Sequence, residues 1–405
     1  MTEKQALVNA GSKKDRTILL AGLIAYGIGQ SLLYIIFAPI GQTIGMPAWQ
    51  IGTVISISNL GILFAAPFWG RKSDVIGRRK VLVIGLIGFG FGYFGLAVVL
   101  QFGLLGLINA LPLFLFLVLA RLFYGSLAGA IQPAAQAYIA DTTDEGSRAK
   151  GMALIASAGG LGTIIGPIFA GGLAEVSPLF PMYVAGLIGL VVSIWTHFNL
   201  KEPTKIIAPN SQGIMFRVFR QIFPYLLGWF VVFFVFTAIQ TITVFMINNQ
   251  LGIIDSQDQI RTMRNAFLFM ALITVVMQVG VMQIWKMEPR ILLRLAFIFF
   301  GFVILVMPYV SSDFELYLLF MAMGFAVSLV MPSLTSAASL TVSSSDQGIA
   351  AGLLAAAPTF GMVFGPMSMS ILYQYNAMMP IYFGATLLFL TGIYFCFVKV
   401  PYLEP

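Results

Sequence analysis

The chain has 405 residues, of which 59% are hydrophobic and only 9% are charged. Charged residues make up about a quarter of an ordinary soluble protein, so this chain has too little polar surface to cover itself in water. The composition excludes a set of soluble domains and indicates a polytopic all-α membrane protein. The net charge of +7 is interpreted below as a topology signal and not as a nucleic-acid-binding surface.

Twelve apolar runs are long enough to cross about 30 Å of hydrocarbon. We expect membrane spans near residues 17–39, 50–69, 80–101, 110–139, 148–173, 179–198, 222–248, 262–285, 291–310, 315–341, 347–373 and 377–399. The polar segment before the first run is interpreted as a cytoplasmic tail, because no small-residue cleavage site follows it.

Lys and Arg are distributed unevenly between the connections. The N-terminal tail and the even-numbered connections hold most of them, whereas the odd-numbered connections hold only Arg261 and Arg264. Positively charged connections stay on the cytoplasmic side. An even number of spans then predicts that both termini are cytoplasmic. The short loops suit a multi-pass protein of a prokaryotic plasma (inner) membrane.

The two halves of the chain share landmarks at one offset, which indicates duplication of a six-span unit. Four pairs are each 199 residues apart: Gly125 and Gly324, Pro133 and Pro332, Gly166 and Gly365, Pro167 and Pro366. We predict two pseudo-symmetric six-helix bundles, residues 1–198 and 222–405, joined by a cytoplasmic linker over 199–221. Two such halves around a midplane cavity suit alternating access.

Three segments of the first half carry distinctive patterns. Residues 70–80, "GRKSDVIGRRK", place five basic side chains and one Asp between two apolar runs. Residues 117–130 read "LVLARLFYGSLAGA", and residues 159–172 read "GGLGTIIGPIFAGG". The first pattern predicts a tight, charged turn at a membrane face, since Gly permits close backbone approach.

These segments resemble, in order, the loop signature between spans two and three of the major facilitator superfamily, its fourth-span signature, and the antiporter signature of its drug/proton antiporter members. The fourth-span signature departs from the pattern at Tyr124, where many members have Gln. The resemblance implies the major facilitator fold of two six-helix bundles over the whole chain.

The resemblance also implies a cytoplasmic gate made of Gly70, Asp74, Gly77, Arg78 and Asp141. In the family the loop Asp meets the N-terminus of span eleven in the outward-facing state, and the Arg after the second Gly pairs with an acid at the end of span four. The alternative is a set of solvated charges that only enforces topology.

The expected start of span eleven, "SSSDQG" at residues 343–348, reads as a helix-capping segment.

Span five presents small residues on one helix face, among them Gly162 and Gly166, followed by Pro167, which can bend a helix. Such a face permits close helix packing in lipid. The resemblance adds that this packing controls the rocking of the halves and is typical of exporters.

Arg121 is the only ionisable residue expected well inside a span, and a charge there is costly enough to suggest function. It could bind an anionic or polar substrate, or belong to a proton-coupling network. The alternative is a structural Arg satisfied by carbonyl groups and water.

None of the fifteen acidic residues falls in the middle of an expected span, and His197 lies at the end of span six. This departs from the usual drug/proton antiporter pattern. Proton coupling would then run through Asp141 or Asp74, or through the charge of the substrate. A positive cavity favours substrates that carry carboxylate, phosphate or phenolate.

The other polar residues within spans are candidates for substrate contacts, although each could equally join helices. The substrate-binding candidates beside Arg121 are Tyr124, Gln30, Tyr34, Asn59, Gln132, Gln136, Gln240 and Gln278.

The sequence and its resemblance favour a secondary active transporter that moves small organic amphiphiles or drug-like compounds, by proton-coupled efflux. The alternative is transport of a specific anionic metabolite such as a siderophore, a carboxylate or a lysolipid. A sensor is disfavoured because no loop is long enough for an output domain, and an enzyme because no catalytic constellation is evident. The expected partners are the lipid bilayer, the substrate and protons, with no cofactor and no metal, and we expect a monomer.

Overall fold

The computed structural model describes residues 13–143, 145–203, 212–281, 289–343 and 346–398, and within these ranges the chain forms helices and no strand. Parts of the predicted tail, of the linker (residues 204–211) and of the eighth span (residues 282–285) lie outside the described residues.

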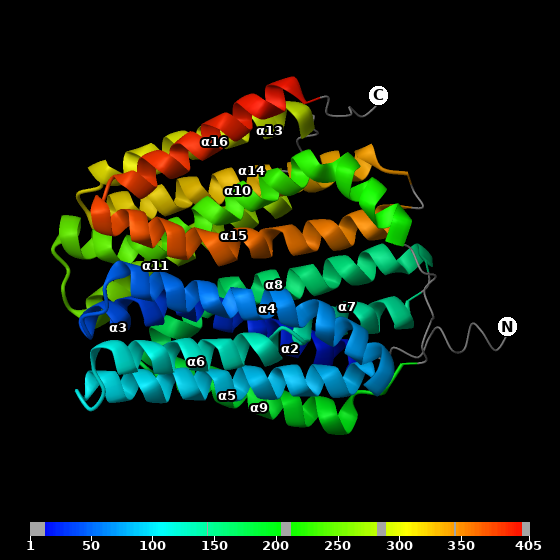
Figure 1. Ribbon diagram of the computed structural model, residues 1–405, viewed down its shortest axis with the longest axis horizontal. Coiled ribbons are helices and arrows are strands. Elements are labelled where there is room, and N and C mark those ends of the chain that lie inside the picture. Colours follow the sequence, from blue (N-terminus) through cyan, green and yellow to red (C-terminus); the bar gives the residue numbers. More distant parts are fainter. Residues whose placement is uncertain (1–12, 144, 204–211, 282–288, 344–345, 399–405) are drawn as a thin grey trace, which may run out of the picture. The chain divides into compact units, whose positions relative to one another are not determined.

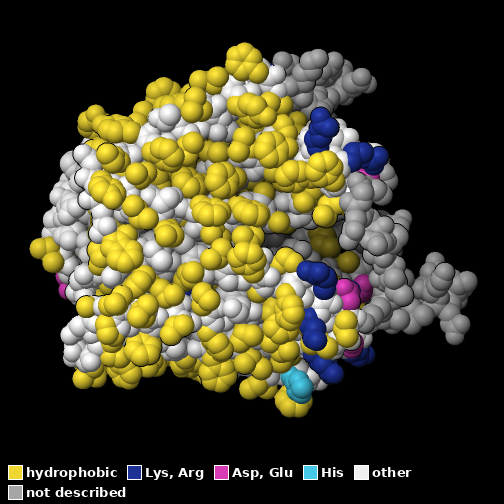
Figure 2. Space-filling view, viewed as in Figure 1, with side chains coloured by type: hydrophobic (Ala, Val, Ile, Leu, Met, Phe, Trp, Pro, Cys, Tyr) yellow, Lys and Arg dark blue, Asp and Glu magenta, His cyan; other side chains and the backbone are white. Residues whose placement is uncertain are grey.

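Twelve segments of the described chain are long and apolar enough to cross a membrane, which confirms the predicted all-α membrane fold. The α-helices are α2 (Lys13–Leu32), α3 (Ala38–Thr43), α4 (Ala48–Ile76), α5 (Arg78–Leu104), α6 (Ala110–Ala128), α7 (Ile131–Thr142), α8 (Glu145–Ala174), α9 (Phe180–Asn199), α10 (Gln212–Leu251), α11 (Ser256–Val275), α13 (Pro289–Val306), α14 (Asp313–Thr341), α15 (Gln347–Tyr375) and α16 (Met379–Phe397). Two π-helical segments, η1 (Leu33–Phe37) and η2 (Val276–Val281), and one 3₁₀ segment, η3 (Met307–Tyr309), join them. On the face shown in Figure 2, hydrophobic side chains cover the sides of the helices, as expected for surfaces that face lipid.

The chain divides into two compact units. Unit 1 comprises residues 1–46 and 57–208, and unit 2 comprises residues 47–56 and 209–405. The first residues of α4 therefore belong to unit 2, where Met367 N–H donates to Ser56 Oγ at 3.0 Å. The predicted first bundle did not anticipate this assignment. Residues 212–221, predicted as linker, form the start of α10.

The two units repeat the same helix pairs. In unit 1, α2 packs on α8, and α5 packs on both α9 and α6. In unit 2, α10 packs on α15, and α13 packs on both α16 and α14. Figure 1 shows α13 and α16 lying side by side. Equivalent pairs in equivalent order are what duplication of a six-helix unit produces.

Four predicted spans are not continuous α-helices, since η2 lies within the eighth, η3 lies within the ninth, and the first and fourth are interrupted as well. The first contains η1, in which Ala38 N–H bonds to Leu33 O in the wide π pattern. The α-helix resumes at Ala38, and Pro39 lies in the first turn of α3, where its missing N–H is tolerated. The fourth span breaks at Gly129–Ala130 between α6 and α7. Pro133 cannot donate to Gly129 O, which explains the break.

The segment "GRKSDVIGRRK" was predicted as a loop but is almost entirely helical. α4 extends to Ile76 and α5 begins at Arg78, so Gly77 alone separates them. Gly77 has φ +104°, in the region where side-chain-bearing residues are strained. The two helices therefore continue beyond their apolar parts and meet at one glycine.

Candidate functional site

Arg78 is the centre of a polar cluster where α4, α5 and α7 meet. Its Nε donates to Asp141 Oδ2 at 2.8 Å, and its Nη2 lies 2.6 Å from Asp74 Oδ1. Its Nη1 donates to Ser73 Oγ at 2.5 Å. The side chains of Arg78 and Asp141 are 8% and 5% exposed, whereas that of Asp74 is 58% exposed. The Arg78–Asp141 pair is therefore the buried interaction, and the pair with Asp74 is largely hydrated.

A carboxylate that sequence reasoning missed completes this cluster. Glu202, just after α9, accepts hydrogen bonds from the backbone N–H groups of Arg78 and Arg79 at the start of α5. An acid at this position satisfies helix N–H groups that have no partner within the helix. A Cβ on Gly77 would lie 2.7 Å from the Glu202 carboxylate. Glycine at 77 therefore allows both the turn and the approach of Glu202.

Unit 2 has its own ion pair before α15. Arg217 Nη2 lies 2.8 Å from Asp346 Oδ2, and the Asp346 side chain is 8% exposed. Asp346 makes no side-chain capping hydrogen bond to α15, so its part of the predicted capping segment is wrong. Residues 344 and 345 of that segment lie outside the described residues. Asp346 therefore acts as the partner of Arg217 instead.

The small residues of the fifth span pack against the first span, inside unit 1. A Cβ on Gly162 would lie 2.3 Å from Ile24 O, and one on Gly166 would overlap Ser31 Oγ. In unit 2, α15 approaches α10 in the same way, since Gly361 and Gly365 face the carbonyl groups of Phe230 and Phe234. Pro167 is accommodated inside α8. The glycines thus fix close helix pairs within each unit.

Arg121 lies on the buried face of α6 and is fully buried. Its guanidinium carbon is 4.2 Å from the centre of the Tyr124 ring and 6.0 Å from that of Tyr93. None of its three guanidinium nitrogens has a hydrogen-bond partner among the described residues. Contact with the ring faces compensates for only part of the lost hydration. This residue is therefore a buried cation with unused donors.

Aromatic side chains surround Arg121. Tyr93 and Tyr124 meet edge to face with ring centres 5.5 Å apart, and Phe89 lies 4.9 Å from Tyr93. Gln30 Nε2 donates to the Tyr124 hydroxyl at 3.3 Å, and the Tyr93 hydroxyl donates to Gly29 O. We call Arg121, Tyr93, Tyr124, Gln30 and Phe89 the Arg121 site.

Tyr93 and Phe89 were not predicted as site residues. Both lie in a glycine-rich stretch of α5, where a Cβ on Gly92 would lie 2.7 Å from Tyr124 Cβ. That run of glycines was the available signal, because it indicates close approach of neighbouring helices and hence burial of the aromatic residues between them.

The remaining predicted substrate contacts divide between the units. In unit 1, Tyr34 lies within η1 and is buried, as is Asn59. Gln132 and Gln136 lie on α7 beyond the helix break, where a Cβ on Gly159 would be 4.0 Å from Gln132 Nε2. The break separates them from the stripe of Arg121 and Tyr124, so the fourth span is not one continuous polar helix.

In unit 2, Gln240 is buried on α10 and Gln278 is exposed within η2. The two π-helical segments thus each contain one predicted candidate, Tyr34 or Gln278, as π-helical turns often do at functional sites.

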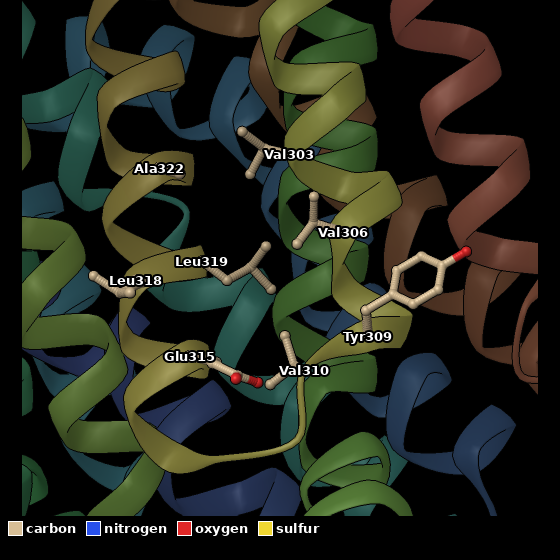
Figure 3. Close-up of a pocket in the computed structure, with 8 residues that line it drawn as sticks. All are labelled: Val303, Val306, Tyr309, Val310, Glu315, Leu318, Leu319 and Ala322. Atoms are coloured by element: carbon tan, nitrogen blue, oxygen red, sulfur yellow. The ribbon is translucent and has the colours of Figure 1, made fainter.

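A pocket of about 280 Å³ in unit 2 lies between α13 and α14 (Figure 3). Its walls are Val303, Val306, Val310, Leu318, Leu319 and Ala322, with Tyr309 and Glu315 at its end. The Glu315 carboxylate accepts hydrogen bonds from the backbone N–H and hydroxyl of Ser311, so it closes the turn before α14. This pocket therefore offers a substrate no free charged group.

Twelve spans and repeated helix pairs define a polytopic helical membrane protein made of a duplicated six-helix unit. The chain belongs to the major facilitator superfamily, whose family model matches residues 19–286. It is therefore a membrane transporter and not an enzyme, as predicted.

Curated relatives cover most of the chain. The chain is 26% identical over 379 residues to multidrug resistance protein 1 of Bacillus subtilis strain 168, covering 92% of this chain and 93% of that protein. It is 26% identical over 344 residues to the class B tetracycline resistance protein of Escherichia coli, covering 82% and 80%.

Solved structures share the fold. A peptide transporter in complex with sulfate gives a TM-score of 0.71 at 15% identity and covers 98% of each chain. The human organic anion transporter MFSD10 gives a TM-score of 0.62 at 20% identity and covers 98% of this chain and all of that chain (100%).

Proposed function

We propose that this transporter exports small organic amphiphiles, including drug-like compounds, by alternating access and in exchange for protons. The observation that carries the proposal is the similarity over more than nine tenths of the chain to a multidrug resistance protein. The antiporter-type glycine pattern of the fifth span supports it, since those glycines hold α8 against α2. We place both termini in the cytoplasm of a plasma membrane and propose that the monomer is the working unit.

The proposed proton route uses the Arg78 cluster. Protonation of Asp141 would remove one member of the buried ion pair with Arg78 and so weaken the attachment of α7 to the start of α5. The proposal therefore ties proton uptake to a structural change at one end of unit 1. Asp74 is too hydrated for its protonation to have a comparable effect.

A second candidate function, transport of a specific anionic metabolite, is favoured by one observation. Among the described residues, none of the three guanidinium nitrogens of Arg121 has a hydrogen-bond partner, and a carboxylate or phosphate could accept from them in a bidentate manner. Such a substrate would also neutralise the buried charge.

The experiment compares two substrate classes in proteoliposomes that contain purified protein. A fluorescent lipophilic amine and a fluorescent carboxylate of matched size are offered under the same imposed pH gradient. Gradient-driven movement of the amine supports multidrug efflux. Movement of the carboxylate alone, lost in Arg121→Ala, would replace efflux with the anion function.

A further inference from the structure

An apolar groove lies between α4 and α6 on the outside of unit 1. It has a volume of about 490 Å³, and its walls include Phe64, Ala65, Phe68, Trp69 and Leu122. Phe64 and Phe68 are 72% and 55% exposed. The only polar side chains among its lining residues, the indole of Trp69 and the hydroxyl of Ser126, donate to the carbonyl groups of Ser126 and Leu122. A hydrocarbon chain would therefore meet no unsatisfied side-chain donor there.

The groove is about as long, measured along α4, as one membrane leaflet is thick. Its lining on α4 runs from Leu60 to Trp69, which is about 14 Å at 1.5 Å per residue. The hydrocarbon core is about 30 Å thick, so one leaflet is about half of that. Trp69 lies at the end nearest Gly77, and Trp is typical of the membrane interface. The groove thus ends where lipid headgroups begin.

Two basic residues continue the same face of α4 beyond the groove. Lys72 follows Phe68 by four residues, and Arg71 follows it by three. Both therefore lie on the side of α4 that lines the groove, one turn beyond it. Both are exposed. In the described part of the chain neither forms an ion pair, and Asp74, the nearest acid in sequence, pairs with Arg78. Arg71 Nε donates to Pro67 O, one turn earlier on α4, at 3.3 Å.

We propose that this groove binds one acyl chain of an anionic phospholipid whose headgroup is held by Arg71 and Lys72. The combination of an apolar wall and two unpaired cations at its headgroup end selects a negatively charged lipid over a zwitterionic one. Ordinary lipid-facing helix surfaces lack this selectivity. The proposal is independent of the substrate that the transporter moves.

The test uses Trp69 as a reporter. Protein in which Trp49, Trp195, Trp229 and Trp285 are replaced by Phe is reconstituted in phosphatidylcholine vesicles that contain a few mole per cent of acyl-brominated lipid. Bromine quenches indole fluorescence on contact. We expect brominated phosphatidylglycerol to quench Trp69 at a much lower mole fraction than brominated phosphatidylcholine does.

Substitution of the two basic residues tests whether they cause the preference for the anionic lipid. Arg71→Gln with Lys72→Gln is expected to lower the preference for phosphatidylglycerol about 25-fold, roughly fivefold for each basic residue. Arg16→Gln with Lys80→Gln removes the same charge from exposed positions outside the groove and should retain the preference. Ala65→Phe, which fills the groove, should weaken quenching by both lipids.

Equal quenching by the two lipids in the four-Phe protein would overturn the proposal. Loss of preference in both double variants would overturn it too, since it would indicate a general charge effect. Native mass spectrometry of the unaltered protein, counting bound phosphatidylglycerol and phosphatidylcholine, gives the same decision if the four-Phe protein does not fold.

Discussion

Arg121 is a single residue whose buried charge opposes stability. Its charge is fully buried, and the ring faces of Tyr124 and Tyr93 compensate for only part of the lost hydration. An uncompensated buried charge is costly, and a hydrophobic residue of similar size is often equal or better for stability. We therefore propose that Arg121 serves substrate binding.

We predict that Arg121→Leu separates stability from transport. The free energy of unfolding should be unchanged or higher by about 1–3 kcal/mol. Movement of a carboxylate substrate should fall about 10- to 100-fold, because hydrogen bonds to a charged group are lost. Thermal unfolding in detergent and uptake in proteoliposomes measure the two effects. A strongly destabilised Arg121→Leu protein would show that Arg121 has a structural role.

The two acids that contact Arg78 should contribute very differently to the free energy of unfolding. Asp141→Asn leaves a nearly buried guanidinium without its buried partner. It should lower the free energy of unfolding by about 2–4 kcal/mol. Asp74→Asn removes a hydrated partner and should cost less than about 1 kcal/mol. Thermal unfolding of both variants under the same conditions provides the comparison. Similar losses would contradict the burial argument.

At the scale of elements, glycines determine how closely helices approach. Gly162→Ala would place a Cβ 2.3 Å from Ile24 O on α2, and overpacking of this kind costs about 1–3 kcal/mol. Gly160→Ala, two residues earlier on α8, meets nothing within 4 Å and should be neutral or stabilising, because Ala favours helix. The same contrast is expected in unit 2 between Gly365→Ala and Gly352→Ala. Equal melting temperatures within each pair would show that the helices can separate without cost.

The stability of the turn between α4 and α5 should depend both on the positive φ of Gly77 and on the room that Gly77 leaves for Glu202. Gly77→Ala combines backbone strain at φ +104° with a contact on Glu202, whereas Gly45→Ala has strain alone at φ +79° with open space around it. We expect about 1 kcal/mol for Gly45→Ala and about 2–3 kcal/mol for Gly77→Ala. Adding Glu202→Ala should recover part of the second loss in a double-mutant cycle. Additive effects of Gly77→Ala and Glu202→Ala would refute the contact.

The elements also show what could be predicted from sequence. Long apolar runs predict spans well, because crossing hydrocarbon requires a continuous helix. The π-helical turn at Leu33–Phe37 and the break at Gly129–Ala130 depend on which carbonyl groups find donors near Pro39 and Pro133, which apolar periodicity does not report. Glu202 was assigned to a linker because its partners, the N–H groups of Arg78 and Arg79, lie more than 120 residues away.

For the whole molecule, each unit repeats one set of helix pairs, and each uses a pair of glycines in its fifth helix to approach its first. The polar content differs between the units: among the described residues, Arg121 of unit 1 is a fully buried cation whose guanidinium makes no hydrogen bond. We therefore expect unit 1 to provide the charged recognition group and unit 2 to provide mainly apolar contact.

The most direct test of the account is proton movement in proteoliposomes that trap a pH-sensitive dye. Substrate is added on one side, and the internal pH is followed for the parent protein, Asp141→Asn and Asp74→Asn. We expect substrate-dependent proton flux in the parent and Asp74→Asn proteins and its loss in Asp141→Asn. Substrate movement in the parent protein without any proton flux would contradict it.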